Sequence, residues 1–281
     1  MIADEDLIVQ GPHATLADAR ALAGVAGASA VESIAAGDTA AFRLRDPRSR
    51  EHVAAAAAAR RLDHAFVPRT RRLRDVRVVS MDMDSTLITI ECIDEIADLL
   101  GIKPKVATIT QSAMRGEIDF RASLMQRVAL LRGLPVSALQ RVYDERLELS
   151  PGAQRMLERF HAAGAQSLLV SGGFTFFTDR LKERVGLHHT LSNVLGIRDG
   201  VLTGQLEGAI IDAGAKAQAL RDLRTALPPG LAVAIGDGAN DLPLFREADV
   251  SIAYRAKPVV RAQATHALDF CGLDAVVNLF N

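Results

Sequence analysis

The chain has few cysteines, no long apolar segment and almost no net charge. Cys92 and Cys271 are the two cysteines among 281 residues, too few for a disulfide framework. No apolar run approaches the roughly 18 residues of a membrane-spanning helix. A formal net charge of -1 gives no general reason to expect binding to nucleic acid or to an anionic membrane. The acidic start, residues 1–6, lacks the basic region and apolar core of a signal peptide. We therefore expect a cytoplasmic protein.

The composition, with 49% hydrophobic and 24% charged residues, fits a globular protein with one large and one small domain. The first 70 residues predict the order β-α-β-β-α-β, which is typical of a ferredoxin-like module. The predicted elements are a strand at 6–10, a helix at 15–23, a hairpin of 31–34 and 39–44 turned at 35–38, a helix at 47–62 and a strand at 63–67. This part carries no catalytic constellation. Five arginines follow between Arg69 and Arg77. They could form a nucleic-acid patch, but no aromatics interleave and Asp75 interrupts the run, so a solvated linker is the better interpretation.

From residue 76 onward, strands and helices alternate, which predicts an α/β domain with a doubly wound, mostly parallel sheet. A helical insertion of about 65 residues follows the first strand and predicts a small bundle. The expected domains are therefore 1–70 and 71–281, with a cap at about 88–149. The expected later elements are a helix capped by Ser150 with Pro151 at its first position, a strand at 166–170, a hairpin at 194–207 turned at Asp199–Gly200, a helix carrying Lys216 and a strand at 231–235.

Paired aspartates follow two of these strands. Asp82 and Asp84 come directly after the strand that begins near Arg77. Two carboxylates at a strand end repel each other and need a cation to stay ionised. Asp237 and Asp241 follow the strand at 231–235, beside glycines that let the backbone close around a metal. Carboxylate oxygens suit Mg²⁺. Each motif alone is weak, but together they predict a magnesium site used for phosphoryl transfer.

Two further features predict anion binding at the same edge of the sheet. Ser171-Gly172-Gly173 ends a strand before a helix, which exposes backbone N–H groups to an anion. Lys216 lies near the start of a helix, where a cation opposes the helix dipole unless a phosphate is bound beside it. Either feature alone is equally consistent with an ordinary turn or a surface lysine.

These four motifs, in this order and spacing, resemble those of the haloacid dehalogenase superfamily. The resemblance covers about residues 76 to 270, and the helical insertion lies where that superfamily places its cap. Within it, the segments Asp84–Leu87, Glu91–Glu95 and Ser171–Thr175 resemble the phosphoserine phosphatases. The N-terminal part is similar to the ACT-like module of longer bacterial members. Met83 stands where many members have phenylalanine and is expected in the core. Cys92 is expected to be a small buried hydrophobe.

The resemblance implies a role for each matched residue. Asp82 would be the nucleophile and would form an aspartyl-phosphate. Asp84 would protonate the departing serine oxygen and then activate water. Mg²⁺ would be bound by the Asp82 side chain, the Asp84 backbone carbonyl and Asp237, with Asp241 acting indirectly or through water. The phosphoryl oxygens would be held by Ser171, Lys216, Asn240 and the Gly172 amide.

The resemblance also implies how the substrate is recognised. Glu91 would pair with the ammonium of phosphoserine and Arg127 with its carboxylate, while Phe120 would form a wall of the pocket. Glu91 shares its helix face with other acids and could simply be solvated. Arg127 lies on an apolar stripe, where an arginine needs an anionic partner or must reach out to solvent.

The expected function is Mg²⁺-dependent hydrolysis of O-phospho-L-serine, the last step of serine biosynthesis. Expected partners are an amino-acid effector at the N-terminal domain and a second copy in a homodimer. Nucleic acid and membrane are not expected. The alternatives are a related phosphatase or phosphotransferase acting on phosphothreonine or homoserine, and an amino-acid sensor without catalysis.

Overall fold

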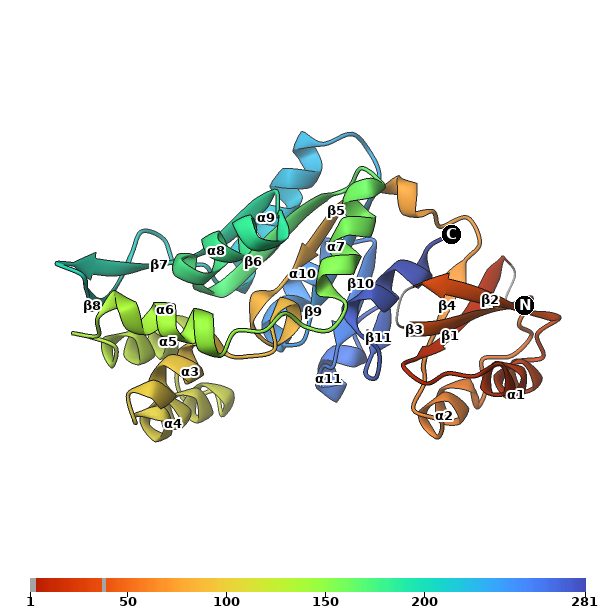
Figure 1. The fold of residues 1–281 in the computed structure, drawn as a ribbon, viewed down its shortest axis with the longest axis horizontal. Coiled ribbons are helices and arrows are strands. Elements are labelled where there is room, and N and C mark those ends of the chain that lie inside the picture. Colours follow the sequence, from red (N-terminus) through yellow and green to blue (C-terminus); the bar gives the residue numbers. More distant parts are fainter. Residues whose placement is uncertain (1–3, 37–38) are drawn as a thin grey trace.

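The structure, a computed structural model, describes residues 4–36 and 39–281 and contains two β-sheets (Figure 1). The smaller sheet lies at one end of the molecule, is antiparallel and has the order β2-β3-β1-β4. Its elements are β1 (Glu5–Gly11), α1 (Leu16–Ala26), β2 (Ala30–Ala36), β3 (Thr39–Arg45), α2 (Val53–Ala58) and β4 (Asp63–Pro68). The order β-α-β-β-α-β predicted from the sequence is observed. The predicted turn at 35–38 includes residues 37–38, which lie outside the described residues.

Three local predictions were wrong. The helix predicted over 47–62 is only α2, because His52 and Arg61 adopt positive φ values of 61° and 55°, which interrupt a helix on either side. Ser150 does not cap the next helix of the large domain. Instead α7 (Ala153–Ala162) begins after Gly152, whose φ of 76° turns the chain into it, and the Ser150 N–H donates to the Leu87 carbonyl. The strand predicted at 166–170 continues as β6 (Gln166–Phe174).

The large sheet has the order β11-β10-β9-β5-β6-β7-β8, and all its neighbours are parallel except β7 and β8. The doubly wound, mostly parallel sheet was therefore predicted correctly, as was the hairpin at its edge. The remaining strands are β5 (Val76–Met81), β7 (His189–Arg198), β8 (Val201–Glu207), β9 (Leu231–Gly236), β10 (Val250–Tyr254) and β11 (His266–Leu268).

Helices cover both faces of this sheet because neighbouring strand residues point to opposite sides. Val79 and Leu169 pack in one apolar cluster, with α7, α8 (Thr175–Val185) and the 3-10 helix η4 (Leu273–Leu279). Val78 and Leu168 pack in another, with α9 (Ala213–Ala226), α10 (Leu242–Arg246) and α11 (Pro258–Arg261). Burial on both sides explains why these strands read as nearly continuous apolar runs.

The predicted helical cap is present as α3 (Cys92–Leu99), α4 (Lys103–Met114), α5 (Phe120–Ala129) and α6 (Val136–Glu145). The two connectors of the cap pair with each other at Ile88 and Leu149. A second attachment lies between α5 and α6, which run beside the β7–β8 hairpin in Figure 1. There the Gly133 N–H donates to the Leu202 carbonyl and the Leu202 N–H to the Leu134 carbonyl, each at 2.8 Å.

The small sheet is also covered on both faces. The helices α1 and α2 pack on one side, and η4 packs on the other, where the buried Asn278 Nδ2 donates to Gln10 Oε1 at 2.8 Å. The arginines of the 69–77 linker are not all solvated, contrary to the expectation, since Arg69 pairs with the buried carboxylate of Asp6 at 2.9 Å. Within the described ranges, no helix is both long and apolar enough to cross a bilayer.

Candidate active site

Three adjacent parallel strands bring the predicted motifs to one edge of the large sheet. The order β9-β5-β6 places the carboxyl ends of these strands side by side. Asp237 follows β9, Asp82 follows β5, and Ser171 lies near the end of β6. Residues far apart in the chain therefore meet where ligands bind in open α/β sheets.

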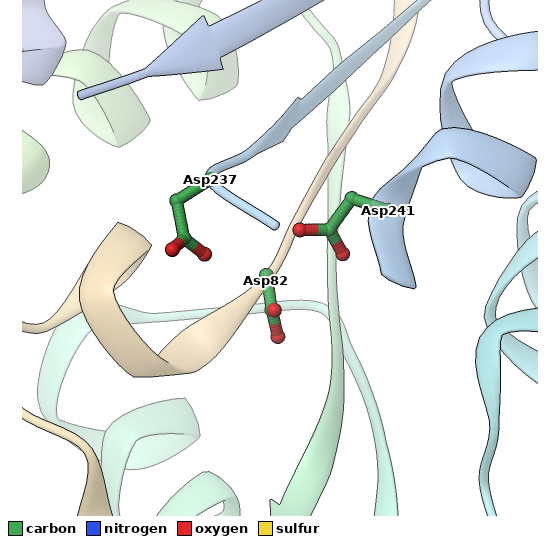
Figure 2. Close-up of side chains that lie close together, drawn as sticks. All are labelled: Asp82, Asp237 and Asp241. Atoms are coloured by element: carbon green, nitrogen blue, oxygen red, sulfur yellow. The ribbon is translucent and has the colours of Figure 1, made fainter. Parts of the chain in front are cut away.

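The aspartates form a compact, largely buried cluster. Oxygens of Asp82, Asp237 and Asp241 all lie within 4.8 Å of one another, and Figure 2 shows the three carboxylates converging. Burial, and then the charge of Asp82, raise the pKa of Asp237 to about 7 and that of Asp241 to about 6. A Cβ on Gly236 would overlap the Asp241 carboxylate, so glycine is required for this approach.

Lys216 is the cation inside this cluster. It lies in the first turn of α9, is only 1% exposed, and its Nζ is 2.9 Å from both Asp82 Oδ1 and Asp241 Oδ1. Burial alone would lower its pKa, but the charges of the two aspartates raise it above the ordinary value. When all three aspartates are ionised, the cluster carries three negative charges against one positive charge. Hard oxygen ligands with this excess of charge suit a divalent cation.

Asp84 lies beside the cluster, in a different environment. Its Oδ1 is buried and has no hydrogen-bond partner among residues 4–36 and 39–281. Burial, followed by the charges of Glu91 and Asp82, raises its pKa well above the ordinary value, and hydrogen bonding from Cys92 partly opposes this. A protonated carboxyl in this position can donate a proton.

The Ser171–Gly173 segment is a tight loop facing the aspartates. Ser171 is buried, and its Oγ accepts a hydrogen bond from the Gly173 N–H at 2.9 Å. A Cβ on Gly173 would lie 2.7 Å from Met83 Cε and 3.5 Å from Asp84 Oδ2, so the second glycine lets the loop approach the residues that follow β5. From the other side, Asn240 Nδ2 donates to Asp82 Oδ2 at 3.3 Å.

The cap adds the three predicted substrate residues. Glu91 accepts a hydrogen bond from Ser85 Oγ at 2.6 Å. Burial lowers the pKa of Arg127, whereas the nearby carboxylates of Asp94, Glu91 and Asp84 raise it. The Phe120 ring lies over Gly172, with Cζ only 3.2 Å from the position of a Cβ there. The charges of Glu91 and Arg127 thus act on Asp84, whereas Phe120 lies against the Ser171–Gly173 loop.

Sequence reasoning missed several residues here. Ser85 adopts a φ of 55° and orients Glu91, and Thr86 Oγ1 lies 3.5 Å from Asp237 Oδ1. The signal was the pair of hydroxyls directly after Asp84. Asp94 was not among the predicted site residues, although its charge acts on Arg127. The expectations for Met83 and Cys92 were correct, because both side chains are fully buried.

Comparisons with known proteins agree with this geometry. The sequence profile of the haloacid dehalogenase-like hydrolases matches residues 79–246. A phosphoserine phosphatase of Polaromonas sp. is 50% identical over 215 residues, 74% of this chain and 91% of the relative. The crystal structure of a probable phosphoserine phosphatase from Vibrio cholerae superposes with a TM-score of 0.87 at 36% identity, covering 99% of this chain and 86% of that chain. That of a HAD family hydrolase from Salmonella enterica serovar Typhi has a TM-score of 0.90 at 33% identity and covers 99% of both chains. The chain belongs to the haloacid dehalogenase-like hydrolases.

Proposed function

We propose that the protein hydrolyses O-phospho-L-serine to L-serine and phosphate in the cytoplasm, with Mg²⁺ as cofactor. The observation that carries the proposal is that one carboxylate and one guanidinium of the cap, those of Glu91 and Arg127, lie near Asp84 at the edge of the aspartate cluster. A zwitterionic amino acid esterified with phosphate has the charges that match this arrangement. The names of the Polaromonas and Vibrio proteins support the same substrate.

Asp82 would attack phosphorus through a carboxylate oxygen, forming an aspartyl-phosphate as the bond to the serine oxygen breaks. The Asp84 proton would go to that oxygen, and Asp84 would then accept a proton from the water that hydrolyses the intermediate. The raised pKa of Asp84 supports the first of these steps, because burial and the neighbouring charges favour the protonated form of the group.

The remaining residues would hold the phosphoryl group without reacting. Ser171, the Gly172 amide, Lys216 and Asn240 would bind its oxygens, so that positioning and charge neutralisation carry most of the catalysis. Asp82, Asp237 and the Asp84 backbone carbonyl would bind the Mg²⁺, with Asp241 next to them. The bound cation would neutralise charge on the transferring group.

The test is phosphate release from phosphoserine, phosphothreonine and an aryl phosphate, with Mg²⁺ and with a chelator. We expect a strong preference for phosphoserine that chelation abolishes. R127M should lose most of this preference but keep aryl phosphate turnover, and D82N should lose both. Preference for phosphothreonine, or transfer to homoserine, would identify a sibling enzyme instead. Full turnover by D82N would contradict the proposed chemistry.

We also propose that residues 1–70 form an ACT-like domain for an amino-acid effector or for assembly, and that 71–281 form the catalytic domain with its cap at 88–149. The β-α-β-β-α-β order and the antiparallel sheet support this. Serine should then change the thermal stability or activity of the full chain, or the chain should be a homodimer in solution. A monomer that is indifferent to serine would overturn this assignment.

A further inference from the structure

The strand pairing beside the Ser171–Gly173 loop is irregular. On one side of the loop Val170 pairs with Leu191, and on the other Phe174 pairs with Asn193. Three residues of β6 therefore stand opposite a single residue of β7, and the loop bulges out of the ladder. A bulge leaves backbone groups without partners from the neighbouring strand, and a buried carbonyl in that position needs another donor.

The side chain of Asn193 supplies that donor. It is 1% exposed, and its Nδ2 donates to the Gly172 carbonyl at 2.9 Å. Its Oδ1 accepts from the Ile211 N–H at 2.8 Å. Ile211 directly precedes Asp212, which caps α9 by accepting from the Ala215 N–H at 2.9 Å. One buried amide thus joins the bulged loop to the start of the helix that carries Lys216.

We infer that Asn193 is a positioning residue that fixes the two phosphate-binding segments, Ser171–Gly173 and the start of α9, relative to each other. The inference rests on the proposed function, because it takes both segments to hold the phosphoryl group. The hydrogen bonds of Asn193 go to the backbone of Gly172 and Ile211, so its role involves neither the recognition of the amino-acid part of the substrate nor Asp82. Asn193 should therefore matter equally for every phosphate ester that the enzyme accepts.

The variant N193D tests this with almost no change of shape. It keeps an acceptor for the Ile211 N–H, but it places an oxygen against the Gly172 carbonyl, so that two acceptors face each other. The loop should move away, and a shift of about 1 Å at a reacting group can cost roughly 100-fold in rate. We expect kcat/KM to fall by about 10- to 100-fold, equally for phosphoserine and for an aryl phosphate. The inhibition constant of inorganic phosphate should rise, because the displaced loop would bind phosphate more weakly.

Asn278 provides the matched control. It is also a buried asparagine, with its Nδ2 donating to Gln10 Oε1 at 2.8 Å, but it belongs to η4 and contacts the small sheet. N278D should lower the stability of the protein and leave kcat/KM and phosphate inhibition unchanged. In N193S the shorter side chain cannot reach both the Gly172 carbonyl and the Ile211 N–H, so this variant breaks the link between them without adding a charge, and it serves if N193D does not fold.

The outcomes are distinct. Folded N193S with wild-type kcat/KM on both substrates would overturn the inference, and so would folded N193D that keeps the wild-type value at pH values where its carboxyl is ionised. So would a loss confined to phosphoserine, since Asn193 would then act through recognition of the amino acid. If the wild-type enzyme hydrolyses only the aryl phosphate, the proposed substrate is wrong, while the comparison of Asn193 variants on that ester still decides the inference.

Discussion

Removing the charge of Lys216 should strongly destabilise the folded protein. In K216M, Asp82 and Asp241 would stay buried without the ammonium that lies 2.9 Å from each. Breaking a buried ion pair by removing one partner costs about 3–5 kcal/mol, because the remaining charge is uncompensated. The Lys216 side chain is only 2% exposed, so solvent screening does not reduce this figure. We expect the free energy of unfolding to fall by about that amount.

Urea denaturation at pH 8, with a chelator to remove bound metal, measures the change. The control is K103M, since Lys103 also pairs with a carboxylate, that of Glu95 at 3.6 Å, but its side chain is 46% exposed. Exposed pairs contribute about 0–1 kcal/mol, so this variant should unfold almost like the wild type. If K216M and K103M show the same small loss, the buried-charge reasoning is refuted.

A second substitution separates lost charge from lost packing. D241N removes one of the two orphaned carboxylates, so K216M/D241N should recover part of the stability that K216M loses. Recovery is expected because neutralising one aspartate also relieves its repulsion with Asp82. No recovery in the double variant would indicate that the methionine simply packs badly in the position of the lysine.

Two further predictions concern the metal and the cap. Mg²⁺ should raise the melting temperature more at pH 8 than at pH 5, because protons compete for Asp237 and Asp241, whose pKa values of about 7 and 6 leave them largely protonated at the lower pH. In D237N, the difference between the Mg²⁺ effects at the two pH values should nearly vanish. An equal Mg²⁺ effect on the wild type at both pH values would contradict this prediction. G204A should raise the KM for phosphoserine, because a Cβ on Gly204 would lie 2.8 Å from the Arg132 Cβ and would push on the end of α5, which carries Arg127. The control is G200A: Gly200 also has a φ of 77°, but a Cβ there would have nothing within 4 Å, so this variant should only lose about 1–2 kcal/mol of stability. Equal KM values for the two variants would show that the added methyl group at residue 204 does not displace α5.

The large domain could be predicted from the sequence because its signals are local. Each buried strand is a short apolar run, and the aspartate motifs directly follow such runs, as Asp82 follows β5 and Asp237 follows β9. The ends of parallel strands meet at one edge, so spacing along the chain was enough to place these residues together. The resemblance to a known family added Glu91 and Arg127, whose own sequence context is ambiguous.

The parts that could not be predicted depend on contacts between distant segments. The break before α2 comes from the backbone of His52, whose neighbours include a long run of good helix formers. Ser150 looked like a helix cap, but its N–H donates to the Leu87 carbonyl across the base of the cap, and the chain turns into α7 only at Gly152. Asn193 lies in a strand of ordinary composition, and its role is visible only once the bulge in β6 is known.

The two residues of the cap that we propose to recognise the substrate are held to the rest of the molecule in different ways. Glu91 lies just after the connector that pairs at Ile88 and accepts a hydrogen bond from Ser85, which directly follows Asp84. Arg127 lies on α5, whose end is tied to β8 by the backbone hydrogen bonds of Gly133 and Leu134. Any movement that opens the cap must therefore break these bonds or carry the hairpin with it. Because β7 is one strand of this hairpin and also carries Asn193, the position of Arg127 and the shape of the Ser171–Gly173 loop depend on the same strand.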